Sequence, residues 1–294
     1  MNSHLKDGNG CPEVIKSHLD HVTLADIVYG AAVGDALGVP YEGFGRDMFT
    51  CRGMDGYGSH NQPAGTFSDD TSMMLALCDS IREKGGAIGL DDMREKFRAW
   101  LNRGAYTPAP AAFGIGRTTM VSLDQGFGLS DEHSNGNGSL MRTLPLALSH
   151  ATDAEVRAVS AITHAHPLSQ ESCIIAVRIA RDLIAGKTLD EALSTCNPAF
   201  EDLSRIPFIL DYSRDDISSS AYVVSTLEAA LWCLGTTSSY EECVLEAVNL
   251  GGDTDTVACV AGAFAGIVYG KDAIPEEWLD DLRGKDLIDA CLFE

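Results

Sequence analysis

Hydrophobic residues recur at intervals of three and four positions along most of this 294-residue chain, the spacing that places side chains on one face of an α-helix. Met73, Leu77 and Ile81 share one such face, and two glycines end the pattern at 85–86. The pattern predicts helices over residues 24–38, 69–84, 90–102, from 117, 139–148, 154–162, 169–184, 188–196, 220–234, 240–250, 254–269 and 276–292.

No stretch has the alternation of a β-strand, and neither a domain linker nor an internal repeat is evident. We therefore predict one all-α, multi-helix domain over residues 23–294, preceded by a polar tail over residues 1–22. Hydrophobic residues make up 45% of the chain and aromatic residues only 7%, which favours closely packed helices. The small residues of 261–266 are expected at the centre, where helices approach closely.

The formal net charge is −22, which argues against binding to nucleic acid or to anionic membranes, since both require a basic face. The ordinary explanation of the charge is solubility. The longest apolar run, 257–269, is shorter than the ~20 residues of a membrane span. Nine cysteines without a CxxC motif, and an N-terminus without a signal-peptide pattern, indicate a reducing compartment. We expect a cytoplasmic monomer.

Two predicted helix starts carry more acidic and hydroxyl residues than a helix cap requires. One is Phe67-Ser68-Asp69-Asp70-Thr71, and the other is Gly251-Gly252-Asp253-Thr254-Asp255-Thr256. Asp, Ser and Thr are common N-caps, so capping is the simple alternative for each start alone. Four carboxylates brought together would repel one another unless cations neutralised them. We therefore hypothesise that the two starts converge on hard divalent metal, for which oxygen ligands favour Mg²⁺, Mn²⁺ or Ca²⁺ over Zn²⁺.

Other polar stretches are candidates for ligand contact. Gly114-Ile115-Gly116 and 134–139 are glycine-rich turns before helices, and they are either phosphate-binding turns or ordinary connections. Arg142 follows among apolar residues, so we expect an acidic partner, and a site aspartate is a candidate. His164 and His166 lack the spacing of a zinc site and suit ligand contact or helix capping. Glu42 precedes a long glycine-rich loop at 43–66, of a kind that often covers a site.

Taken in order, these blocks resemble the ADP-ribosylglycohydrolase family. They are Gly34-Asp35-Ala36-Leu37-Gly38 with Glu42, Phe67 to Thr71, Asn137-Gly138-x-x-Met141-Arg142, Ile162-Thr163-His164-x-His166-Pro167, Ser220-Ala221-Tyr222 and Gly251 to Thr256. The last third is most similar to the bacterial dinitrogenase reductase-activating glycohydrolase branch. The resemblance implies an all-α fold with a central two-metal site, Mg²⁺ or Mn²⁺, and cleavage at the ribose C1″ of an ADP-ribosylated protein side chain, often arginine.

The resemblance also implies roles for individual residues. The metal ligands would be Ser68, Asp69, Asp70, Asp253, Asp255 and Thr256. The residues lining the ADP-ribose pocket would be Gly114, Gly116, Asn137, Gly138, Ser139, His164 and Tyr222. A carboxylate among Glu42, Asp70 and Asp255 would position or deprotonate the attacking water.

The chain departs from the family pattern at two positions. Ser68 stands where threonine is usual and keeps the hydroxyl. Ala112 stands about where arginine-specific relatives have an aspartate that would hold the guanidinium. Arginine-linked ADP-ribose is the expected substrate. The first alternative is O-linked ADP-ribose (serine-linked or O-acetyl-ADP-ribose). The second alternative is that the protein is a non-catalytic relative that binds ADP-ribose or serves a structural role.

Overall fold

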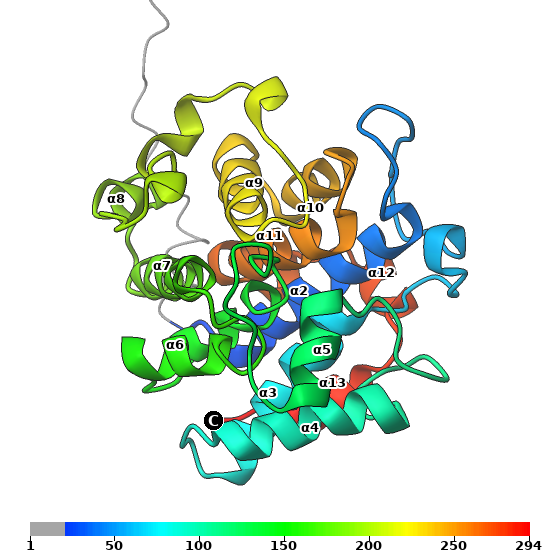
Figure 1. The fold of residues 1–294 in the computed structure, drawn as a ribbon. Coiled ribbons are helices and arrows are strands. Elements are labelled where there is room, and N and C mark those ends of the chain that lie inside the picture. The colour runs from blue at the N-terminus through cyan, green and yellow to red at the C-terminus, as the bar shows by residue number, and fades with distance from the viewer. Residues whose placement is uncertain (1–20) are drawn as a thin grey trace, which may run out of the picture.

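The computed structural model describes residues 21–294, and two helices, α2 (Leu24–Gly38) and α11 (Thr254–Tyr269), pack against each other at its centre (Figure 1). Neither has a polar face: α2 is buried along almost its whole length, and α11 is buried from Thr254 to Ile267. Helices that are apolar on all sides are expected in the middle of a large helical core. The predicted central position of residues 261–266 is confirmed.

Glycines explain how closely α2 and α11 approach. Gly30 and Gly34 lie one turn apart on α2, and a Cβ there would stand 2.3 Å from the Gly262 carbonyl oxygen and 2.1 Å from that of Ala258. At the end of α2, a Cβ on Gly38 would stand 2.4 Å from the backbone nitrogen of Asp255. The C-terminal end of α2 therefore lies directly against the N-terminal end of α11, where the acidic cluster begins.

This contact predicts a stability effect. Gly34→Ala is expected to lower the free energy of unfolding by about 1–3 kcal/mol or more, because the new methyl group would overlap backbone that cannot move without separating the two central helices. Gly53→Ala is the matched control, since its Cβ would meet nothing closer than the Trp278 indole nitrogen at 3.6 Å and its φ is not positive. Urea unfolding of both variants measures the difference. Equal effects at the two positions would contradict the predicted overlap.

The remaining helices surround this pair (Figure 1). They are α3 (Asp69–Glu83), α4 (Leu90–Arg103), α5 (Arg117–Gln125), α6 (Asp153–Ser160), α7 (Pro167–Ile184), α8 (Leu189–Ser194), α9 (Val223–Thr236), α10 (Tyr240–Asn249), α12 (Glu276–Asp281) and α13 (Lys285–Cys291). Short 3₁₀ helices connect them: η1 (Val39–Tyr41), η2 (Gly58–His60), η3 (Leu140–Arg142), η4 (Leu144–Leu148), η5 (Glu201–Leu203), η6 (Ile206–Asp211), η7 (Arg214–Asp216) and η8 (Lys271–Ala273).

The all-α prediction is confirmed. Over residues 21–294 no strand forms, and β-type pairing is limited to isolated bridges such as Leu129–His164 and Gly136–Tyr222. Within the same residues no helix is long and apolar enough to cross a membrane. The predicted tail, residues 1–22, lies outside the described residues except for its last two positions, of which Val22 packs against the core.

Two predicted helices were wrong in detail. The helix expected over 139–148 is a pair of 3₁₀ helices, because Pro145 lies in the first turn of η4 and cannot donate a backbone hydrogen bond. The helix expected over 276–292 is divided into α12 and α13 at Gly284, whose φ of 74° is left-handed. The break lets the Arg283 amide bond to the Gly65 carbonyl.

The expectation that Arg142 pairs with a site aspartate was also wrong. Its guanidinium is fully buried, and it donates to the carbonyl oxygens of Gly138 and Val159 and to the hydroxyl of Thr163. It also lies over the Phe97 ring, 4.8 Å from the centroid. Backbone and hydroxyl oxygens therefore accept from both terminal nitrogens of this buried cation, an aromatic face covers it, and its Nε has no hydrogen-bond partner within residues 21–294. Burial lowers the pKa of the guanidinium to about 10.

Candidate functional site

Ser68 and Asp35 cap the N-terminus of α3, whereas the side chains of Asp69 and Asp70 do not. Ser68 is the N-cap, and its hydroxyl accepts from the Asp70 backbone N–H at 3.3 Å. The carboxylate of Asp35, from α2, accepts from the Ser68 and Thr71 N–H groups at 2.9–3.0 Å and from the Thr71 hydroxyl at 2.7 Å. Because these groups satisfy the helix end, capping leaves the two aspartate side chains unexplained.

Asp70 shows this most clearly. Its Oδ2 accepts from the Ser68 hydroxyl at 2.8 Å, but its Oδ1 is buried and has no hydrogen-bond partner within residues 21–294. A buried polar atom without a partner loses its hydration and gains nothing in return. A cation is the partner that a carboxylate oxygen in this position accepts best, so the residues fit a divalent ion.

The start of α11 is built by a left-handed turn of two glycines. Gly251 and Gly252 have φ of 74° and 75°, and a Cβ on either would collide with the backbone of Arg46 or of Ser219. The turn brings Asp253 to the N-cap position, where its carboxylate accepts from the Asn137 side-chain amide at 2.5 Å. The glycine pair therefore serves both the left-handed turn and a close approach of chain segments.

The two helix starts meet. Single carboxylate oxygens of Asp35, Asp70 and Asp255 all lie within 4.8 Å of one another. Burial, followed by mutual repulsion, raises the pKa values of Asp69, Asp70 and Asp255 well above the ordinary range. Burial also raises the pKa of Asp35 to about 6, against the lowering effect of its hydrogen bonds. The convergence predicted from the sequence is present, with Asp35 as an additional member.

These shifts give a pH prediction. Carboxyl groups with raised pKa values hold protons in the folded state that the unfolded chain releases, so the stability of the metal-free protein falls as pH rises above ~4. For Asp35 the pH range over which stability is lost ends near pH 6, and for the more strongly shifted carboxyl groups that range extends to higher pH. Mg²⁺ competes with these protons, and at a hundredfold excess over Kd it is expected to stabilise the fold by about 2.7 kcal/mol at high pH, and by less in acid.

Thermal unfolding with and without MgCl₂, near pH 5 and near pH 8 (about three units apart, spanning the shifted carboxyls), measures this competition. A magnesium effect of the same size at both pH values would contradict the assignment of these carboxyl groups as ligands.

A cavity of about 330 Å³ opens beside the acidic cluster. The predicted site residues in its wall are Glu42, Asp69, Gly114, Gly116, Asn137, Gly138, His164, Asp253, Asp255 and Thr256. Ser68, Asp70 and Ser139 are buried outside this lining. Tyr222 is half-buried and donates its hydroxyl to Asp202 at 2.9 Å, while its neighbour Ala221 lines the cavity.

Steric contacts explain two glycines of the glycine-rich turns, Gly114 and Gly138. Gly114 has a φ of 82°, and a Cβ there would stand 2.5 Å from an Asp69 carboxylate oxygen. A Cβ on Gly138 would stand 2.8 Å from the His164 ring. At Gly116, before α5, a Cβ would meet nothing within 4 Å, so the backbone faces open space. Space therefore requires glycine at Gly114 and Gly138, while at Gly116 the missing side chain leaves the backbone open to the cavity.

His164 is a neutral donor at physiological pH. Burial and the charge of Arg142 lower its pKa to about 3. Arg142 donates to the Thr163 hydroxyl at 2.8 Å, which leaves the hydrogen of that hydroxyl free to donate to His164 Nδ1, also at 2.8 Å. The ring proton then resides on Nε2, which lies beside Gly136 in the cavity wall.

Thr163→Val tests this chain of hydrogen bonds from Arg142 through Thr163 to His164. The substitution keeps the shape of the side chain but removes the hydroxyl that fixes the His164 tautomer, so ADP-ribose binding is expected to weaken roughly tenfold. Thr236→Val, at an exposed position on α9, is the control. Isothermal titration with ADP-ribose measures the affinity of both variants. Unchanged affinity in Thr163→Val would show that the hydrogen bonds from Arg142 through Thr163 to His164 do not contribute to ADP-ribose binding.

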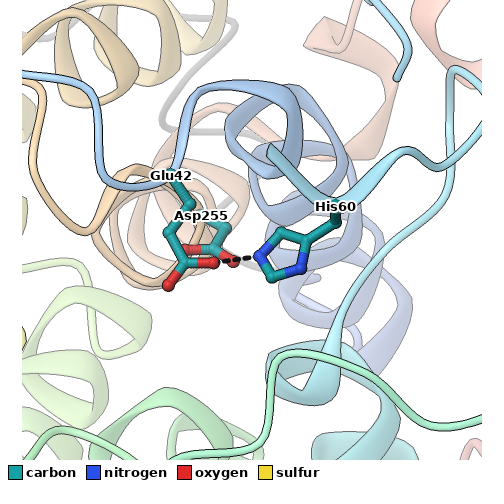
Figure 2. A group of neighbouring side chains, drawn as sticks. All are labelled: Glu42, His60 and Asp255. Atoms are coloured by element: carbon teal, nitrogen blue, oxygen red, sulfur yellow. Dashed lines mark hydrogen bonds and ion pairs between the residues drawn. The ribbon is translucent and has the colours of Figure 1, made fainter. Parts of the chain in front are cut away.

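Glu42 follows η1 directly, and its side chain lies beside Asp255 (Figure 2). Its loop is joined to the α11 turn by paired backbone bonds, since Gly43 N–H donates to the Gly252 carbonyl and Gly252 N–H donates to that of Phe44, both at 2.8 Å. Arg46 anchors the loop further through the carbonyl oxygens of Leu250, Arg214 and Ile217. Glu42 and the aspartates of α11 therefore belong to one connected unit.

Sequence reasoning missed two members of this site. Asp35 stands inside the block 34–38, between the two glycines that contact α11, but no role was predicted for it. His60 lies in the loop 43–66, where no periodicity marks any residue, yet its ring contacts the Glu42 carboxylate. That hydrogen bond is the largest of the influences that raise the pKa of His60. Only a long-range contact could identify either residue.

The fold and the site together define an all-helical domain with buried carboxylates beside a cavity, and comparison with known proteins gives its family. The family model for ADP-ribosylglycohydrolases matches residues 23–293. The chain belongs to the ADP-ribosylglycohydrolase family and is an enzyme of that family.

Three relatives give the range of similarity. ADP-ribosylarginine hydrolase Tri1 of Serratia proteamaculans is 34% identical over 88% of this chain and 75% of that protein. The ADP-ribosyl-dinitrogen reductase glycohydrolase of Rhodospirillum rubrum is 34% identical over 87% of this chain and 88% of that protein. A solved structure described as an ADP-ribosylglycohydrolase-related protein complex aligns with a TM-score of 0.78 and 28% identity, covering 94% of this chain and 97% of that one.

Proposed function

We propose that this enzyme hydrolyses the N-glycosidic bond between ADP-ribose and an arginine side chain of a modified protein, with the help of two divalent metal ions, Mg²⁺ or Mn²⁺. The relatives at 34% identity are named for arginine-linked and dinitrogen reductase-linked ADP-ribose. The observation that carries the metal dependence is the buried, unpartnered Oδ1 of Asp70 among converging carboxylates.

The residues that would hold the ions are the oxygen donors of the two helix starts: Ser68, Asp69, Asp70, Asp253, Asp255 and Thr256. Oxygen donors of this kind suit Mg²⁺ and Mn²⁺. When bound, the ions would supply positive charge that orients the ribose hydroxyls and lowers the pKa of a nearby water. Asp35 would hold the α3 start in place through its hydrogen bonds to Ser68 and Thr71.

Glu42, Asp70 and Asp255 are the proposed catalytic carboxylates. Glu42 lines the cavity, where it can orient the attacking water and accept its proton, while Asp255 stands beside it. Glycosidic cleavage passes through an oxocarbenium-like state, so carboxylates near C1″ also stabilise the developing positive charge.

The proposed substrate-binding residues are Gly114, Gly116, Asn137, Gly138 and His164, which line the cavity, and Ser139 and Tyr222, which lie outside its lining. Main-chain N–H groups at the two glycine-rich turns could receive the diphosphate without added basic residues, which suits a chain of net charge −22. His164 contributes a neutral Nε2–H donor. The charge also disfavours nucleic acid and anionic membranes, and we propose a cytoplasmic monomer acting on a protein substrate.

O-linked ADP-ribose is the second candidate, and Ala112 is the observation that favours it. This half-buried alanine is two residues before Gly114. It stands about where, by the family resemblance, arginine-specific relatives have an aspartate that would hold the guanidinium. A serine-linked or O-acetylated substrate needs no such partner.

The experiment is a direct comparison of linkages. Purified enzyme with MgCl₂ or MnCl₂ is given ADP-ribosyl-arginine peptide, ADP-ribosyl-serine peptide and O-acetyl-ADP-ribose, and released ADP-ribose is measured by chromatography. We expect fastest release from the arginine conjugate and none after chelation. Release only from an O-linked conjugate would replace the first candidate by the second, and undiminished release after chelation would overturn metal dependence.

A further inference from the structure

His60 is brought to Glu42 by a turn with strained backbone. Tyr57 and Asn61, on either side of η2, have φ of 69° and 51°, values that non-glycine residues rarely adopt. Strained backbone persists only where the surrounding structure enforces it, and it is concentrated at functional sites. A functional role of the turn would explain this strain, and His60 is the residue that the turn places next to Glu42.

The turn is pressed against the segment that carries Glu42. A Cβ on Gly58 would stand 2.0 Å from the carbonyl oxygen of Pro40, so only glycine fits there. The hydroxyl of Ser59 donates to the Glu42 carbonyl at 2.6 Å. The turn also closes on itself through the Tyr57–Gln62 bridge. Its place relative to the Glu42 backbone is thus defined independently of the His60 side chain.

The His60 ring completes the contact. Its Nε2 meets Oε2 of Glu42, and Figure 2 shows the two side chains reaching toward each other from different segments, with Asp255 beside Glu42. The other side of the ring lies against Phe113, 5.2 Å between centroids. Phe113 adjoins Gly114 of the cavity wall, so the pair His60–Phe113 joins the Glu42 side of the site to the glycine-rich turn.

Repulsion between Glu42 and Asp255 gives a physical reason for the contact between His60 and Glu42. The nearest oxygens of Glu42 and Asp255 lie within 4.8 Å of each other and of His60. Two carboxylates so close repel, and Glu42 is about one-third exposed at the start of a glycine-rich loop, so it could turn away into solvent. A ring N–H bound to one Glu42 oxygen opposes that movement and leaves the second oxygen available toward the cavity.

We propose that His60 is a positioning residue that holds the Glu42 carboxylate in its working orientation beside Asp255, with Phe113 and the strained turn 57–61 holding the ring. The inference rests on the proposed function, because Glu42 acts only if the enzyme cleaves ADP-ribose linkages. His60 touches neither substrate nor reacting atoms in this role.

The kinetic test uses His60→Ala, His60→Gln, Glu42→Gln and the double variant His60→Ala/Glu42→Gln, with His150→Ala at an exposed position as the matched control. His60→Ala is expected to lower kcat roughly 10- to 100-fold, as loss of a supporting partner does, and to change KM less than about twofold. His60→Gln retains an N–H donor and is expected to recover part of the rate. In the Glu42→Gln background, His60→Ala should have little further effect, since its target is already changed.

A Mn²⁺ titration separates positioning from metal ligation. The grouping of Glu42, His60 and Asp255 could also hold an ion, in which case His60→Ala would weaken Mn²⁺ binding and glutamine would not rescue the rate. Unchanged Mn²⁺ affinity with lowered kcat supports positioning. Additive losses in the double variant, or a fall in Mn²⁺ affinity, would overturn it.

Failure of the proposed function is recognised separately. If the wild-type enzyme releases nothing from the arginine conjugate, that proposal fails, and the same variants are then compared on whichever O-linked conjugate the wild type cleaves. Non-additivity of His60 and Glu42 on that conjugate supports the inference, and additivity overturns it.

Discussion

Asp255→Asn is expected to lower kcat by at least ~1000-fold, because metal charge at the reacting centre contributes several kcal/mol and each 1.36 kcal/mol is a factor of ten. Asp255 is the shared member of both groups of potential ligand atoms, with Asp35 and Asp70 on one side and with Glu42 and His60 on the other. No other residue of the cluster has this double position.

The same substitution should not destabilise the metal-free fold. Asn is close in shape to Asp, and the substitution removes a buried carboxyl group whose own pKa is raised by burial and by repulsion from Asp70 and Asp253. We therefore expect equal or higher thermal stability without metal, together with loss of most of the stabilisation that Mg²⁺ or Mn²⁺ confers on the wild type.

Steady-state hydrolysis and thermal unfolding with and without metal measure the two effects together. Asp190→Asn, at an exposed position of α8, is the control and should leave both unchanged. Hydrolysis and metal-induced stabilisation that both survive in Asp255→Asn would show that the acidic cluster is not the metal site.

Glu42→Gln is expected to lower kcat by roughly 100- to 10,000-fold, the usual range for loss of a general base, with much less change in ADP-ribose affinity. Glu42 belongs to the cavity wall, but its loop is held by backbone bonds to Gly252 and by Arg46, which the substitution does not alter. The amide keeps the size of the side chain and removes its negative charge and its basicity.

Single-turnover hydrolysis and a separate ADP-ribose titration distinguish the two outcomes. Glu277→Gln, exposed on α12, serves as the control. Should Glu42→Gln weaken ADP-ribose binding more than it slows hydrolysis, Glu42 would be a binding residue, and Asp70 or Asp255 would remain as candidates for the base.

Not all of the fold could be read from local pattern. Helix periodicity predicted α2, α3, α4, α7, α9, α10 and α11 close to their observed bounds, because each helix has a continuous apolar face and most have a recognisable end signal. The 3₁₀ geometry before Leu148 follows from Pro145, a local signal that the helix prediction did not use. The division at Gly284 depends on how that segment meets Gly65 and Phe67, and a window of sequence contains no information about such contacts.

The sequence by itself determined the helical class, the central small-residue helix and the two acidic helix starts, since spacing, propensity and capping act over a few residues. The tertiary structure alone decided that Asp35 supports α3, that Arg142 bonds to Thr163 rather than to an aspartate, and that His60 meets Glu42. The physical reason is that these contacts join residues from different segments. Their energies depend on burial and on the distances between charges, which exist only once α2 and α11 have packed together.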